Sequence, residues 1–276
     1  MEKIRKNKKV IAVFLIPAVL IYLCFELIPV VMSVYFSFND WPGLQAVPLK
    51  FVGFKNYSNL FHNAVFLKSL QNVLIYVVVS VILQVPIGFG LGLLIHHFKK
   101  GQRFFKAAFF IPMILSVTAV ALLWNFIYFP TDKGILNSLL IKIGLGNYIQ
   151  QWLVNPKTSL ICLIVVSTWT SVGYYMIICL AGLTSIPDSV LEAGELDGAT
   201  GWKKIWNLYI PMLWEPLKMS TIMVITGVLK IFDTVYILTP TGGTSNCTIV
   251  PALLMYNEAY RYGHYGTCLL YTSDAA

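Results

Sequence analysis

Five long apolar runs constrain the fold of this chain more than any other feature. They cover residues 10–38, 73–95, 104–129, 159–183 and 211–238. A helix needs roughly 20 apolar residues to cross the hydrocarbon core of a bilayer, which is about 30 Å thick. Charged residues make up 12% of the chain, against roughly 25% in a typical soluble domain. The sequence therefore predicts an all-α, polytopic membrane protein with five spans.

The positions of the cations predict the orientation of these spans. Lysine and arginine are dense before the first run and directly after the second, and sparse in the segments between. Because cytoplasmic loops carry an excess of such residues, we expect a cytoplasmic N-terminus. Residues 96–103 and 184–210 would then be cytoplasmic. The first run is too long for the apolar region of a signal peptide and lacks a cleavage site, so we expect it to be retained. The net charge of +8 comes mostly from these lysines, which argues against nucleic-acid binding.

The last nine residues, "CLLYTSDAA" at 268–276, stand where a sixth apolar run should begin. They resemble the in-frame translation of a sequencing adapter, and a genuine polar C-terminus is the alternative. We expect a transmembrane domain over residues 1–267 that is incomplete at its C-terminal end, with a truncated sixth span.

The cytoplasmic segment 184–210 contains "LEAGELDGATGWKKIWNLYIP" at 191–211. Ser189 and Glu192 have the spacing of a capping box, which predicts a short helix over 190–196. Gly198 and Gly201 should end it, because glycine tolerates left-handed backbone. Beyond them an apolar stripe with helical spacing predicts a second short helix along the membrane surface, with Pro211 opening the next span. The stripe consists of Trp202, Ile205, Trp206 and Tyr209.

Small residues in the first short helix would let a partner approach closely, although a plain connecting loop is an alternative. The motif here resembles the EAA loop of binding-protein-dependent ABC transporter permeases, whose pattern is Glu-Ala-Ala-x3-Gly-x9-Ile-x-Leu-Pro. Three positions depart from this pattern: Gly194 replaces Ala, Leu208 replaces Ile, and Ile210 replaces Leu. The stretches "AGLTSIP" at 181–187 and "LDGAT" at 196–200 narrow the resemblance to carbohydrate-uptake permeases of the maltose and multiple-sugar type.

This resemblance implies a type I ABC importer permease fold in a bacterial inner membrane, without a cofactor. The expected partners are a second similar permease, two cytoplasmic ATP-binding subunits and an extracytoplasmic binding protein that delivers a sugar. In such proteins the EAA loop sits in a groove of the ATPase and transmits its motion. The implied coupling residues are Glu192, Ala193, Gly194, Asp197 and Gly198. The stretch "GATGWKK" at 198–204 lacks the spacing of a P-loop, so ATP hydrolysis is expected on a separate subunit.

A path for sugars needs aromatic rings beside polar side chains. The stretch "STWTSVGYY" at 167–175 offers both, although simple helix packing would also explain it. Charges inside a span are costly and therefore suggest function. Lys230 and Asp233 should share a face of the fifth run, either in the pathway or compensating each other's charge, and Glu26 could pair with a neighbouring subunit. The predicted pathway residues are Trp169, Tyr174, Tyr175, Lys230 and Asp233. The glycines of "GFGLG" at 88–92 predict close helix packing.

Two other classes of protein compete with this interpretation. An ion-coupled secondary transporter would need a relay of intramembrane acids or an inverted repeat. Glu26 is isolated, and no inverted repeat is evident in the sequence. A membrane scaffold or sensor would leave the spacing of the 184–210 segment unexplained. A permease for a non-sugar solute, such as a glycerol phosphate, remains an alternative within the family. The five scattered cysteines and the acidic residues predict neither a metal site nor a catalytic centre.

Overall fold

The computed structural model describes residues 8–40, 49–98 and 101–262. These residues are helical except for loops and one two-residue antiparallel ladder, which agrees with the predicted all-α class. The chain divides into two compact units, one made of residues 1–67 with 254–276 and the other of residues 68–253. The predicted adapter remnant and the start of the predicted sixth span lie outside the described residues.

The first unit contains the first apolar run. It forms α2 (Lys8–Tyr22), a π-helical turn η1 (Leu23–Leu27) and α3 (Ile28–Ser37). The strands β1 (Asn39–Asp40) and β2 (Lys50–Phe51) then pair, and α4 (Lys55–His62) follows. The Asn56 amide holds α4 to the end of this run by donating to the carbonyls of Ser37 and Asn39, both at 3.0 Å. The unit also includes η5 (Asn257–Arg261).

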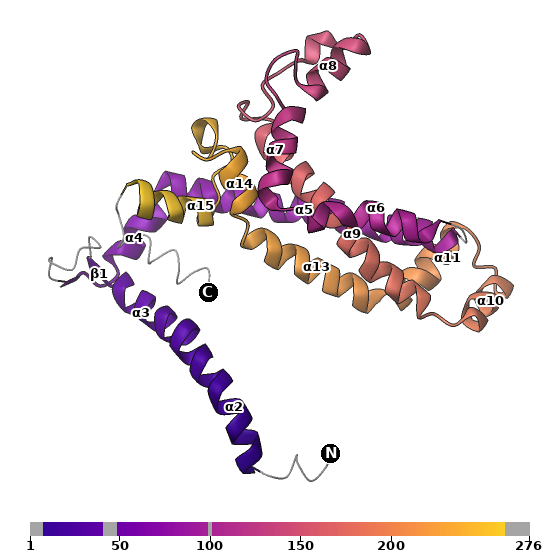
Figure 1. The fold of residues 1–276 in the computed structure, drawn as a ribbon, viewed down its shortest axis with the longest axis horizontal. Helices are drawn as coiled ribbons and strands as arrows, with labels where there is room; N and C mark the ends of the chain where they lie inside the picture. The colour runs from indigo at the N-terminus through magenta and orange to yellow at the C-terminus, as the bar shows by residue number, and fades with distance from the viewer. Residues whose placement is uncertain (1–7, 41–48, 99–100, 263–276) are drawn as a thin grey trace. The chain divides into compact units, whose positions relative to one another are not determined.

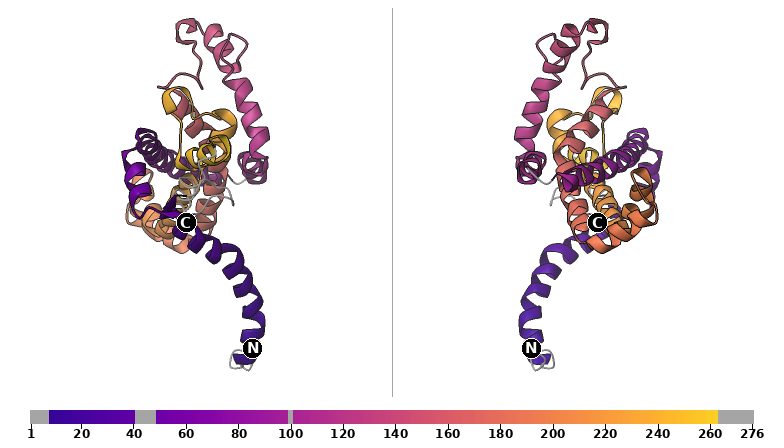
Figure 2. Two further views of the ribbon diagram at one scale, coloured as in Figure 1. Left: turned by 90° about the vertical axis from the view of Figure 1, so that its left-hand side faces the viewer. Right: turned by 90° about the vertical axis from the view of Figure 1, so that its right-hand side faces the viewer.

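The second unit carries the remaining predicted spans and the segment between them. Its long helices are α5 (Ala64–His97), which enters the unit at Lys68, and α9 (Ser159–Thr184). Its other helices are α6 (Gln102–Ile114), α7 (Val117–Ile127), α8 (Ile135–Lys142), η2 (Gly146–Tyr148), α10 (Asp188–Leu196), α11 (Trp202–Lys204), η3 (Ile205–Tyr209), α12 (Ile210–Met212), α13 (Trp214–Leu229), α14 (Asp233–Leu238) and η4 (Thr244–Asn246), and α15 (Pro251–Tyr256) begins in it. Within this unit α5, α6, α9 and α13 lie side by side, with α10 and α11 at one end (Figures 1 and 2).

Among the described residues, three helices are long and apolar enough to cross a membrane, and up to five if each of two bent pairs is one span. The first bent pair is α6 with α7, which meet at 98°. The run 104–129, predicted as one span, is therefore two helices with a bend between them. Leu115 and Ser116 adopt extended backbone, and the Ser116 hydroxyl caps α7 by accepting the Ala119 N–H at 3.2 Å.

The second bent pair changes the predicted fifth span. Helical structure that begins at Trp202 continues past Pro211 to Met212, and the chain bends by 74° before α13. The prediction that Pro211 opens the span was wrong, because the π-helical turn η3 carries the helix into α12 and the break falls at Leu213. A further break after Leu229 separates α13 from α14.

Glycines allow the helices of the second unit to approach closely. A Cβ atom at Gly88 would lie 2.8 Å from the Cβ of Tyr175, and one at Gly92 would lie 3.3 Å from the Cβ of Cys179. These contacts confirm the predicted close packing of the 88–92 stretch, here between α5 and α9. Gly173 does the same on another side of α9, where the backbone of Phe109 in α6 occupies the space of its missing side chain.

Candidate functional site

The segment that joins α9 to α13 forms the predicted pair of short helices with a glycine elbow. Gly198 and Gly201 have φ values of +82° and +54°, which side chains rarely adopt, so glycine is required for the turn. The predicted capping box was wrong. Pro187 occupies the N-cap position of α10 without a side-chain cap, and Ser189 and Glu192 lie inside the helix.

Two contacts fasten α10 to the second short helix. The Lys204 ammonium lies 2.5 Å from a carboxylate oxygen of Glu195. Leu208 fills the space beside Gly194, since a Cβ there would lie 3.3 Å from Leu208 Cδ2. Gly194 therefore makes room for a residue of the same segment, and not for a partner as its size had suggested. Sequence reasoning missed the Glu195–Lys204 pair, because nine positions and a turn separate the two residues.

The coupling segment, as we name residues 184–212, is also packed against the spans. Tyr209 is buried in a cluster with Leu183 at the end of α9, Ile186, and Leu213 at the start of α13. A displacement of α10 would therefore be transmitted to α9 and α13 through this cluster.

The outer face of the coupling segment is exposed and mixes acidic with apolar groups. Leu196 at the end of α10 is 90% exposed, and Trp202 and Trp206 are 76% and 64% exposed. Such a leucine is unusual for a water-facing helix end, and sequence reasoning missed it, because Leu196 follows no apolar stripe. Four of the five predicted coupling residues lie on the exposed surface, namely Glu192, Ala193, Asp197 and Gly198.

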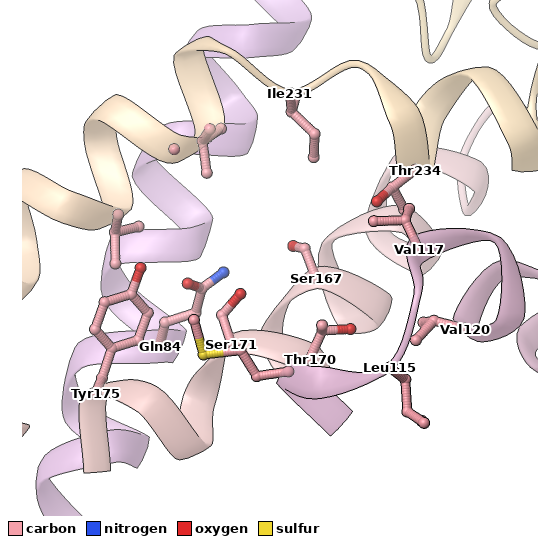
Figure 3. Close-up of a pocket in the computed structure, with 14 residues that line it drawn as sticks. Gln84, Leu115, Val117, Val120, Ser167, Thr170, Ser171, Tyr175, Ile231 and Thr234 are labelled. Carbon is pink, nitrogen blue, oxygen red and sulfur yellow. The ribbon is translucent and has the colours of Figure 1, made fainter. Parts of the chain in front are cut away.

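A second feature is a hollow of about 220 Å³ between α5, α9, α13 and the breaks after α6 and α13. None of the side chains that line it is charged. Its apolar wall comes from residues such as Val120 and Val228. Its polar groups are Gln84, Ser167, Thr170, Ser171, Tyr175 and Thr234 (Figure 3).

The close packing of α5 on α9 at Gly88 brings polar side chains of both helices to the same hollow. Gly88 brings α5 against Tyr175, so Gln84 and Ser171, each one turn earlier on its helix, lie near each other at the hollow (Figure 3). The hydroxyls of Ser167 and Thr170 donate to the carbonyls of Ile164 and Val166 at 3.1 and 2.8 Å. Their oxygens therefore face the hollow mainly as acceptors.

An adjoining hollow of about 420 Å³ continues this space along α13. It shares Ser171 and Tyr175 with the first and adds Tyr174 and Lys230. Three predicted pathway residues, Tyr174, Tyr175 and Lys230, thus line one or both hollows.

The other predicted pathway residues lie elsewhere. Trp169 packs edge-on against Trp124, with ring centroids 5.8 Å apart, and lines neither hollow. The predicted shared face of Lys230 and Asp233 was wrong, because Lys230 is the C-cap residue that follows α13 and Asp233 begins α14. No salt bridge joins these two residues in the part of the chain that the structure describes. Sequence reasoning missed Gln84, although an amide inside an apolar run was a usable signal.

Comparisons with known proteins point to one family. The model of the family described as "Binding-protein-dependent transport system inner membrane component" matches residues 84–272. The probable ABC transporter permease protein YurN of Bacillus subtilis is 36% identical, covering 93% of this chain and 87% of its own length. The lactose transport system permease protein LacF of Rhizobium radiobacter is 32% identical, covering 90% and 83%.

The fold is also that of a solved transporter. A crystal structure of a bacterial ABC transporter involved in the import of the acidic polysaccharide alginate matches with a TM-score of 0.82. The match covers 99% of this chain and 92% of the solved chain, at 21% sequence identity.

Proposed function

The chain belongs to the family of binding-protein-dependent transport system inner membrane components, and from this premise we propose that it moves a sugar or oligosaccharide across the membrane in an ATP-driven importer. It is a multi-pass membrane protein, and its family consists of transport subunits. The relatives named for lactose and for starch degradation products support a saccharide as the cargo.

The proposed assembly has four other polypeptides. A second similar permease completes the membrane pathway, and two cytoplasmic ATP-binding subunits supply energy, because the chain has no P-loop spacing of its own. An extracytoplasmic protein delivers the solute, as the name of the family suggests. The cation-rich N-terminus lies in the cytoplasm, on the same side as the coupling segment.

The observation that carries this proposal is the geometry of the coupling segment. Its outer face offers Leu196 and the acidic residues of α10 to a partner, while its inner face is tied to α9 and α13 through Tyr209. The Glu195–Lys204 pair and the Gly194–Leu208 contact keep the two short helices together. When an ATP-binding subunit closes against α10, the displacement of α10 would therefore move α9 and α13, which line the hollows.

The proposal is tested by substitutions on the outer face of α10 that weaken its contact with the ATP-binding subunit and leave the inner face unchanged. In the purified importer, Leu196→Asp and Glu192→Ala should lower both the amount of co-purifying ATPase and the uptake of substrate into proteoliposomes. A well-packed interface leucine can be a hot spot, so we expect a loss of on the order of tenfold for Leu196→Asp. Insertion should be normal, because it depends on the apolar runs.

Leu145→Asp is the matched control, since Leu145 is also an exposed leucine but belongs to the loop after α8. It should leave ATPase binding unchanged. Full ATPase binding and uptake in Leu196→Asp would remove the coupling role of α10. Uptake that continues after deletion of this chain would contradict the importer assignment itself.

A further inference from the structure

Gln84 is a buried amide that faces the first hollow. Its side chain is 2% exposed, and it points into the space lined by Ser171 and Tyr175 (Figure 3). No residue in the described ranges forms a hydrogen bond with it. An amide offers two donors and an acceptor oxygen, and those of Gln84 are not among the buried polar atoms that lack a partner, so they are accessible from the hollow. This unused hydrogen-bonding capacity is therefore available to a ligand.

The surroundings of Gln84 define the charge of that ligand. Every polar group that lines the hollow is a neutral amide or hydroxyl, and the remaining lining is apolar. A carboxylate or phosphate placed here would lose its water without gaining a counter-ion, which is strongly unfavourable. A ligand with hydroxyl groups could exchange its water for Gln84, Ser167 and Ser171.

The size and the walls of the hollow fit one sugar ring. Its volume of about 220 Å³ lies below the range of roughly 300–1,000 Å³ that holds drug-sized molecules. The ring of Tyr175 provides a flat apolar wall beside the polar groups, which matches the alternation of hydroxyls and apolar faces on a pyranose.

We infer that this hollow binds one uncharged sugar ring through the Gln84 amide, and that its uncharged lining selects neutral sugars over acidic ones. This inference rests on the proposed transport of a saccharide and specifies its class. The rival site is the adjoining hollow, where Lys230 would favour an anionic solute. Lys230 is exposed, whereas Gln84 is buried. An anionic solute at Lys230 would have to displace water from the ammonium group, so the ion pair would contribute little to binding.

The experiment measures binding of two matched probes to the complete importer in lipid nanodiscs, without the binding protein. Methyl β-D-glucopyranoside and methyl β-D-glucuronide differ only at C6, which carries a hydroxymethyl group in one and a carboxylate in the other. Saturation-transfer NMR should detect the glucoside, and the signal of the glucuronide should be on the order of tenfold weaker. Gln84→Leu should lower the glucoside signal about fivefold, the effect of one lost hydrogen bond.

Ser80→Ala is the matched control. Ser80 lies one turn before Gln84 on α5 and is also buried, but it does not line the hollow. This variant should leave the glucoside signal unchanged. ATP hydrolysis by each variant complex checks assembly, and Gln84→Met replaces Gln84→Leu if the latter fails to assemble.

Three results would overturn the inference: an unchanged glucoside signal in both Gln84 variants, equal signals for the two probes, or a glucuronide signal that disappears in Lys230→Gln. Substrate uptake separates these failures from failure of the proposed function. If uptake requires this chain but Gln84→Leu binds the glucoside normally, only the role of Gln84 is wrong. If uptake proceeds without this chain, the proposed function is wrong as well.

Discussion

Leu208 packs directly against Gly194, so that a Cβ at Gly194 would lie 3.3 Å from Leu208 Cδ2 and 3.5 Å from Cδ1. These two residues stand at positions where the EAA pattern has alanine and isoleucine. Two of the three departures from that pattern therefore touch each other. A smaller residue in α10 accompanies a leucine in η3 whose end fills the vacated space.

The contact predicts a compensating pair of substitutions. Gly194→Val should push Leu208 away, cost about 1–3 kcal/mol through overpacking and lower ATP-driven uptake. Adding Leu208→Ala should restore much of the uptake, because the shorter side chain at 208 leaves room for the valine at 194. Gly194→Ala should be tolerated, since only the flexible end of Leu208 has to move. Uptake that falls further in the double variant would show that the two residues do not act through this contact.

A substitution at Gly198 should act through backbone strain and not through steric contact. Its φ is +82°, and a Cβ there would meet nothing within 4 Å. Gly198→Val should therefore strain the elbow by roughly 1–2 kcal/mol and reduce substrate-stimulated ATP hydrolysis, while the protein still reaches the membrane. Gly198→Asn is the control, because asparagine tolerates left-handed backbone, and it should retain most of the activity. If ATP hydrolysis fell equally in both variants, backbone strain would not be the cause, and any side chain at this position would be harmful.

Two neighbouring glycines of α5 should respond differently to the same substitution. Gly88→Ala would place a Cβ 2.8 Å from that of Tyr175, whereas Gly90→Ala meets nothing within 4 Å. Thermal unfolding of the purified protein should show a loss of about 1–3 kcal/mol for Gly88→Ala. Gly90→Ala should be neutral or slightly stabilising, because alanine favours helix. A similar shift in both variants would contradict the packing of α5 on α9.

The orientation of the chain is tested by labelling with an impermeant thiol reagent in whole cells. In a cysteine-free background, Lys203→Cys in α11 should be protected and Asn147→Cys in η2 should be labelled. Both positions are exposed, so access depends on the side of the membrane and not on burial. Permeabilised cells provide the control, since both cysteines should then react. Labelling with the opposite pattern would place the N-terminus outside.

The features that the sequence predicted correctly depend on local chemistry. Apolar runs of sufficient length place helices near 10–38, 73–95 and 159–183 wherever their neighbours lie. The elbow at Gly198 and Gly201 follows from backbone that other residues avoid. The capping box failed although it is a local motif, because Pro187 occupies the N-cap position and α10 begins at Asp188, which leaves Ser189 inside the helix. A spacing rule identifies a possible cap but not which residue begins the helix.

The candidate sites, in contrast, were decided by contacts between distant residues. The 98° bend between α6 and α7 falls within an apolar run, after Pro112 and at Ser116, and neither residue fixes the direction that the chain takes. Gln84 and Ser171 lie 87 positions apart, and they meet only because Gly88 lets α5 approach the backbone of α9. The sequence by itself determined which segments are helical, membrane-spanning or turning, since those properties depend on neighbouring residues. Which side chains face the same hollow depended on how closely the helices pack, and only the tertiary structure decides that distance.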